Sequence, residues 1–124
     1  MWAALPDAFA AELQCVSGVD YVCIDQQHGL VDYADMLAML RAIEGRGTVP
    51  LTRVPQNETW LIGKALDAGV QGVVVPMVSN RADAAKAVAA CRYSPKGRAA
   101  SRRRIVGQRG ESAGIRILAV PIAH

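Results

Sequence analysis

One short stretch decides the fold: Val19-Asp20-Tyr21-Val22-Cys23-Ile24-Asp25 has the length and the apolar content of a strand that is buried on both faces. A second stretch of this kind covers residues 70–78, just after Gly69. A third covers residues 49–54, where Pro50 places the strand start at or after that residue. Strands of this kind are typical of a parallel sheet covered by helices, so the sequence predicts such a sheet.

Helical patterns separate the three strands. Three segments carry apolar residues at helical spacing and a fourth is rich in alanine: 9–16, 33–43, 61–66 and 80–91. Side chains that cap helices stand at three of the starts: Asp32 with Asp35, Asn57, and Asn80 with Asp83. Strand and helix alternate with a period of roughly 20 to 30 residues, which is typical of successive βα units. Residues 1–92 are therefore predicted to be α/β.

The composition is that of a globular protein with an uneven charge. The chain has 124 residues, of which 52% are hydrophobic and 20% charged, and it has room for one ordinary domain. Its net charge of +3 hides two regions of opposite sign. Residues 1–91 carry 6 Lys/Arg against 10 Asp/Glu, whereas residues 92–124 carry 8 Lys/Arg against Glu111 alone. An acidic apolar region is thus followed by a basic tail.

The same sequence argues against membrane, secreted and metal-scaffold classes. Its apolar runs are shorter than a membrane span, and its N-terminus lacks the charged start of a secretory signal. The three cysteines, Cys15, Cys23 and Cys91, are odd in number and widely spaced, which argues against a disulfide framework or a zinc site. We expect buried free thiols and a cytoplasmic location.

The candidate site follows from the position of polar residues at strand ends. In parallel α/β folds, ligands bind at the carboxyl ends of the strands. One predicted strand ends in Asp25, with Gln27 and His28 just beyond, and the next ends in Arg53. The following strand ends in residues 76–78, Pro-Met-Val. An acid, a base and a fixed cation thus converge at one edge of the sheet.

These side chains suit acid–base chemistry. His28 can act as a general base, and Asp25 can orient its ring and stabilise the imidazolium. Arg53 can bind a carboxylate through two hydrogen bonds or offset the charge of a developing oxyanion. Each residue alone also has a structural interpretation: His28 as an ordinary structural histidine, Arg53 as the partner of a neighbouring carboxylate, and Asp25 as a loop cap.

Six segments together resemble, in order and spacing, the HpcH/HpaI aldolase family, whose members include 2-dehydro-3-deoxyglucarate aldolase and 4-hydroxy-2-oxoheptanedioate aldolase. The resemblance covers residues 2–98. The segments are 4–12 (ALPDAFAAE), 19–29 (VDYVCIDQQHG), 53–55 (RVP), 64–69 (KALDAG), 75–78 (VPMV) and 92–98 (RYSPKGR).

The resemblance implies a (β/α)8 TIM barrel and a class II aldolase, a carbon–carbon lyase. Such an enzyme reversibly cleaves a 2-oxo (2-keto-3-deoxy) acid to a pyruvate-type enolate and an aldehyde, with a divalent cation (Mg, Mn or Co) that stabilises the enolate. Matched residue by residue, His28 is the acid/base group, Asp25 supports it and Arg53 contacts the substrate oxyanion. Gln27 stands where the family often has Glu, and Pro76 and Met77 wall the substrate site.

The resemblance ends near Arg98, where the charge also changes. Only about the first four βα units of the barrel are recognised, in residues 1–98. Residues 99–124 are predicted to be an irregular, non-homologous basic tail, and our hypothesis is that this tail is out-of-frame translation. The family's carboxylate metal ligands belong to later strands, so we identify no metal ligand and expect impaired activity. We also expect small-molecule partners, no membrane, and a homo-oligomer for the intact family member.

The tail also supports a different interpretation. Its arginines are those of a phosphate-binding arm on a non-catalytic α/β binding module: Arg98, Arg102, Arg103, Arg104 and Arg109. No aromatic residue follows Tyr93 to stack on bases, which argues against recognition of single-stranded nucleic acid. Nucleic acid is therefore the less favoured partner.

Overall fold

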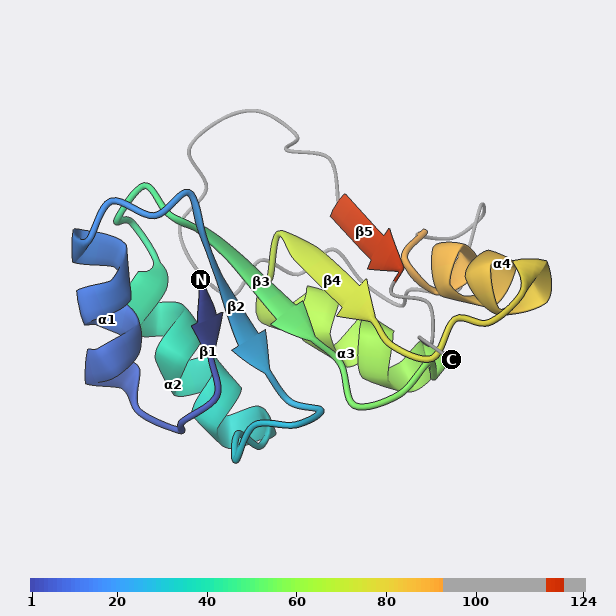
Figure 1. Cartoon of the computed structure of the whole chain (residues 1–124), viewed down its shortest axis with the longest axis horizontal. Coiled ribbons are helices and arrows are strands. Elements are labelled where there is room, and N and C mark those ends of the chain that lie inside the picture. The colour runs from blue at the N-terminus through green and yellow to red at the C-terminus, as the bar shows by residue number, and fades with distance from the viewer. Residues whose placement is uncertain (93–115, 120–124) are drawn as a thin grey trace.

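The computed structural model describes residues 1–92 and the backbone of residues 116–119. Strands and helices alternate along the chain (Figure 1). The elements are β1 (Trp2–Ala3), α1 (Ala8–Val16), β2 (Tyr21–Asp25), α2 (Tyr33–Ile43), β3 (Val49–Arg53), α3 (Thr59–Ala68), β4 (Gly72–Val75), α4 (Arg81–Ala90) and β5 (Arg116–Ala119). The predicted α/β class is confirmed.

The sheet is parallel and its strands lie side by side in chain order, from β1 to β5. The main core joins buried side chains of α1 to α4 with strand residues such as Ile24 and Val73. The strand residues that point to the opposite face, Cys23, Leu51 and Val74, form a separate small cluster. The four helices therefore cover one face of the sheet, and Figure 1 shows α2 and α3 behind it.

This winding distinguishes between two kinds of parallel sheet. In a doubly wound fold the strand order reverses and helices cover both faces, whereas a barrel keeps chain order and carries its helices on one side. Sequential order with one covered face is the barrel arrangement. The predicted relation to the TIM barrel is confirmed for the described part of the chain, and the small cluster around Cys23 lies on the face that a barrel turns inward.

Strand boundaries differ from the predictions where backbone chemistry intervenes. Because Pro76 has no N–H to donate, β4 ends at Val75 rather than extending to Val78. Two strands were not predicted, β1 and β5. The two-residue β1 is too short to give a pattern, and it is held by the N-terminal amine of Met1, which donates to the Tyr21 carbonyl at 2.9 Å. The fifth strand pairs with β4 in parallel, so the prediction of an irregular tail is wrong for residues 116–119.

Two of the predicted helix caps are confirmed and one is wrong. Asp32 and Asp35 form a reciprocal capping box at the start of α2, and Asn80 accepts from the Asp83 amide at the start of α4. Asn57 does not cap α3, which begins after Glu58 without a side-chain cap. Its side-chain amide instead donates to the Asp83 carbonyl at 3.0 Å, so it joins two segments that are distant in sequence.

The apolar stripe of α1 faces solvent. Phe9, Leu13 and Val16 predict the helix correctly, but they are 66%, 52% and 71% exposed. An apolar stripe of this kind ordinarily faces the core. In this structure the small side chains of Ala11 and Cys15 face the core instead, which allows α1 to pack closely on its neighbours.

We expect the chain to self-associate through this stripe, since a contiguous exposed apolar surface favours burial against another molecule. Light scattering after gel filtration should give a mass above that of the monomer for the wild type. Replacing Phe9 with Ser and Leu13 with Gln should return the mass to that of the monomer. Leu30→Ser is the matched control, because Leu30 is exposed to a similar degree outside α1. A wild-type monomer would contradict the expectation.

The predicted phosphate-binding arm and the predicted basic tail both fall largely on residues that the structure does not describe. The arginines assigned to a phosphate-binding arm, 98, 102–104 and 109, lie outside the described residues. So does most of the predicted basic tail, 99–124. Among the helices that are described, none is long and apolar enough to cross a membrane.

Candidate functional site

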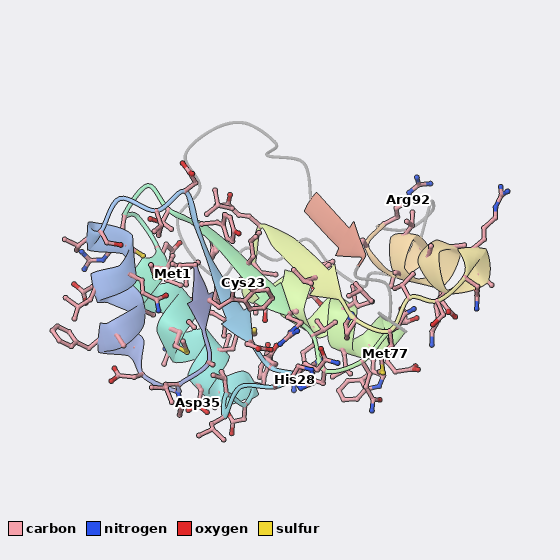
Figure 2. All side chains as sticks on the ribbon, viewed as in Figure 1. Met1, Cys23, His28, Asp35, Met77 and Arg92 are labelled. Atoms are coloured by element: carbon pink, nitrogen blue, oxygen red, sulfur yellow. The ribbon has the colours of Figure 1, made fainter. Side chains whose placement is uncertain are left out.

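The strand register brings the predicted site residues to one edge of the sheet. Asp25, the last residue of β2, lies directly beside Arg53, the last residue of β3. Arg53 in turn lies beside Val74 of β4, which ends one residue later. Figure 2 shows His28 and Met77 beyond the arrowheads of β2 and β4, at this same carboxyl edge. The prediction from strand ends therefore places these groups correctly.

The centre of the edge is an ion pair between Asp25 and Arg53. The Arg53 Nε donates to Asp25 Oδ1 at 2.8 Å, and Nη2 donates to Oδ2 at 2.5 Å, so the pair is bidentate. Both side chains are largely buried, with 8% of Asp25 and 19% of Arg53 exposed. A guanidinium has five N–H donors, so three of those of Arg53 are not used by Asp25. These three can serve an anionic or carbonyl oxygen.

Asp25 also organises the loop that follows it. Its Oδ1 accepts from the backbone amides of Gln27 at 3.1 Å and His28 at 3.2 Å. The Gln26 amide donates to the Arg53 carbonyl at 3.0 Å, which extends the β2–β3 pairing into the loop. One carboxylate therefore fixes both the loop and the guanidinium beside it. Its contact with His28 is to the backbone, and the proposed support of the imidazole ring stays a prediction.

The other four predicted site residues differ in how far their side chains are exposed to solvent. His28 is exposed and Gln27 is half-buried at the edge. Pro76 is buried, whereas Met77 is half exposed and has a φ of 56°. A left-handed backbone at a residue other than glycine costs free energy and often marks a functional loop. The roles of Pro76, Met77 and Gln27 as substrate contacts stay predictions.

Sequence reasoning missed two residues of this edge. Gly29 lies so close to other segments that an added Cβ would come within 2.2 Å of the Asp25 carbonyl and 2.9 Å of the Ala4 carbonyl. The neighbouring Leu30 amide donates to the Ala4 carbonyl at 2.8 Å. The second missed residue is Trp2, whose ring lies under the Arg53 guanidinium, with 4.7 Å between Cζ and the ring centroid. Neither contact leaves a periodic signal in the sequence.

The ion pair shifts the pKa values of its members. Burial alone would raise the pKa of Asp25, but hydrogen bonds from Arg53 and from the amides of His28 and Gln27 outweigh it and hold the pKa below its ordinary value. The hydrogen bonds to Asp25 raise the pKa of Arg53. The neighbouring Cys23 is buried, and burial together with the charge of Asp25 raises its thiol pKa to about 12. Cys23 is therefore a neutral packing residue and not a nucleophile.

Asp25 makes folding stability depend on acid pH. The pKa of Asp25 is lower in the folded state than in the unfolded state. The charged carboxylate therefore stabilises the fold fully at a pH above the unfolded pKa of about 3.9, and this stabilisation is lost as the pH falls through the folded pKa. Asp25→Asn should lower the free energy of unfolding at pH 7 by about 3 kcal/mol, since Arg53 loses its partner. The difference from the wild type should shrink below pH 4 in urea titrations. A difference independent of pH would contradict this assignment.

A cavity of about 330 Å³ lies next to this edge but is not part of it. The Lys64 ammonium lies 3.9 Å from the centroid of the Tyr33 ring in its wall. Asp25, His28 and Arg53 do not line it. The lining residues are Gln26, Val31, Asp32, Tyr33, Pro55, Trp60, Leu61, Lys64 and Ala65.

The divalent cation implied by the resemblance does not fit the described residues. Within residues 1–92, no cluster of three or more His, Cys, Asp or Glu side chains could hold a metal ion. The one carboxylate at the edge, Asp25, is held by Arg53. The described residues alone therefore do not form a site for the cation.

Comparisons with known proteins agree with this architecture. A family model described as HpcH/HpaI aldolase/citrate lyase matches residues 1–120. The chain is 38% identical over 96 residues to a hydroxypyruvate/pyruvate aldolase of Roseovarius nubinhibens, covering 77% of this chain and 37% of that protein. It is 34% identical over 96 residues to a 5-keto-4-deoxy-D-glucarate aldolase of Salmonella paratyphi A, with 77% and 38% covered.

A solved structure shows the same likeness. The structure of a HpcH/HpaI aldolase/citrate lyase family protein from Burkholderia cenocepacia J2315 superposes with a TM-score of 0.74 at 36% identity. The superposition covers 86% of this chain and 42% of that one. The chain thus spans about two fifths of the length of the relatives it matches.

Proposed function

The chain belongs to the HpcH/HpaI aldolase/citrate lyase family, and on that premise we propose that it serves the reversible aldol cleavage and condensation of a 2-oxo acid. The substrates would be a pyruvate-type 2-oxo acid and an aldehyde. One observation carries the proposal: Arg53 is fixed at the carboxyl edge of the sheet with three N–H donors that Asp25 does not use.

Arg53 would stabilise the negative charge that forms in the reaction. When a proton leaves C3 of a 2-oxo acid, the electron pair moves to the C2 oxygen and gives an enolate. Donors that are already oriented toward such an oxygen lower the barrier, because they need not reorganise as the charge develops. Arg53 carries a permanent positive charge, and Asp25 holds the plane of its guanidinium. Asp25 is then a positioning residue for the arginine.

His28 is the proposed acid/base group. It is exposed at the same edge, and a histidine ring carries nitrogens that can accept and donate a proton. It would take the C3 proton during condensation and return a proton in the cleavage direction. Gln27 would donate a hydrogen bond from its side-chain amide to the substrate. Pro76 and Met77 would form the wall of the site.

A divalent cation is expected for the whole enzyme, as a Lewis acid for the enolate oxygen. The described residues do not form its site. The roles given above are therefore limited to the side chains of this chain. Mg, Mn and Co are the candidates to be tested.

Hydrogen exchange at C3 of pyruvate tests the proposal without knowledge of the aldehyde. The protein is incubated with pyruvate in D2O, with Mg, Mn, Co or no added cation, and deuterium uptake is measured by mass spectrometry. We expect exchange at least ten-fold faster than with the same cation alone, as acid–base catalysis is worth about 10² or more. His28→Asn should abolish the gain. Exchange no faster than in the protein-free controls would contradict the proposal.

A further inference from the structure

Trp2 lies on the same face of the sheet as the ion pair. Its backbone pairs with Cys23, whose side chain points away from the helices, as does that of Asp25 two residues later. The Trp2 ring and the Arg53 guanidinium are in contact, with Cζ 4.7 Å from the ring centroid. Trp2 nevertheless stays 48% exposed, so burial alone does not explain where its ring lies.

The two contacts of Arg53 restrain it in different directions. Asp25 holds one edge of the guanidinium through two hydrogen bonds in its plane. The guanidinium also lies over the Trp2 ring, where the negative charge of the π-system attracts the cation. An edge contact alone would let the paired groups swing together about the long arginine side chain. The ion pair and the ring contact together restrict the orientation of the three remaining donors.

The backbone of Trp2 is itself held in place. The Met1 carbonyl on one side of it accepts from the Cys23 amide at 2.8 Å, and the Trp2 carbonyl accepts from the Gln14 side-chain amide at 3.3 Å. The first residues of the chain are thereby tied to β2 and α1. Trp60, the second tryptophan, is 64% exposed on α3 and lines the cavity beside the edge. It offers a comparison within the same chain.

We propose that Trp2 is a positioning residue that fixes the orientation of the Arg53 guanidinium at the carboxyl edge. Its consequence for ligand binding rests on the proposed function. If Arg53 receives the oxygens of a 2-oxo acid, the tryptophan keeps its donors in place before the ligand arrives and so strengthens binding. The contact acts through a face, so another aromatic side chain should replace it in part, whereas an aliphatic one of similar bulk should not.

The test uses the full chain labelled with ¹⁵N and the variants Trp2→Leu, Trp2→Phe and Trp60→Leu. The Arg53 Nε–H resonance is identified by its loss in Arg53→Lys. Its chemical shift reports the nearby Trp2 ring, and its line shape reports the rate at which the proton exchanges with solvent. We expect Trp2→Leu to move this resonance and to speed its exchange about five-fold, the scale of a partly exposed cation–π contact. Trp2→Phe should lie between it and the wild type, and Trp60→Leu should match the wild type.

Pyruvate affinity is the second measurement. Trp2→Leu should weaken pyruvate binding by a similar factor, and Trp2→Phe should recover most of the loss. A role in folding alone would lower the melting temperature and leave the solvent exchange rate of the Arg53 Nε–H unchanged, which would overturn the inference. Equal effects of Trp2→Phe and Trp2→Leu would overturn it as well. A wild type that does not bind pyruvate would contradict the proposed function, and the Arg53 resonance would still decide the role of Trp2.

Discussion

Arg53→Leu is expected to reduce deuterium exchange at C3 of pyruvate to the rate of the protein-free control, because removal of an oriented donor to an oxyanion usually costs about 100-fold. The enolate oxygen loses its donors, and Asp25 is left as a largely buried, unpaired carboxylate. Arg53→Lys should recover only part of the rate. A lysine keeps the charge but cannot make the two parallel hydrogen bonds that Asp25 accepts.

Arg46→Leu is the matched control for this experiment. Arg46 also forms an ion pair, with Glu12, but this exposed pair joins α1 to the turn between α2 and the start of β3, away from the carboxyl edge. Its removal should leave the exchange rate unchanged and cost less than about 1 kcal/mol of stability. Circular dichroism of both variants separates a chemical from a folding defect. Equal exchange rates for folded Arg53→Leu and wild type would contradict the role given to Arg53.

Gly29→Ala is expected to cause a large loss of stability, because it adds a methyl group where the backbone leaves no room. The new Cβ would meet the carbonyl oxygens of Asp25 and Ala4, and both are backbone atoms that cannot rotate away. The loop must therefore move, and the hydrogen bond from the Leu30 amide to Ala4 is strained or lost. We expect a loss of about 3 kcal/mol and a melting temperature lower by roughly 10 to 20 °C.

Gly63→Ala provides the control for this substitution. Gly63 is buried within α3, but an added Cβ meets no atom within 4 Å. Alanine is the better helix former, so this variant should gain about 0.5 to 1 kcal/mol. Thermal melts of both variants measure the difference. If Gly29→Ala melts with the wild type, the close approach of the loop to β1 is wrong.

The sequence predicts the parts of the site that lie within or directly after long strands. Asp25 and Arg53 end two apolar runs, and parallel strands bring their ends to a common edge, so their proximity follows from topology alone. The structure also realises an alternative that the residues left open, because Arg53 does pair with a neighbouring carboxylate. Because Arg53 has three N–H donors besides the two that Asp25 accepts, it can pair with Asp25 and bind a ligand at the same time.

The features that were missed depend on contacts between distant segments. Trp2 stands in a strand of two residues, which is too short for any periodicity to appear. Asn57 has the chemistry of a helix cap, but a carbonyl supplied by the tertiary structure competes for its side chain. Phe9, Leu13 and Val16 have the spacing of a core stripe, yet the small residues of α1 take the inner face. The periodicity of apolar residues predicts that α1 is a helix, but it does not predict which face of the helix is buried.

The central claim is that the carboxyl edge of β2 and β3 receives a 2-oxo acid, and titration of the ¹⁵N-labelled chain with pyruvate tests it most directly. We predict that the amide signals of residues 25–29 and the Arg53 Nε–H signal shift together, and that Arg53→Leu removes the response. Shifts confined to the cavity of Tyr33 and Lys64, or no shifts at saturating pyruvate, would contradict the claim.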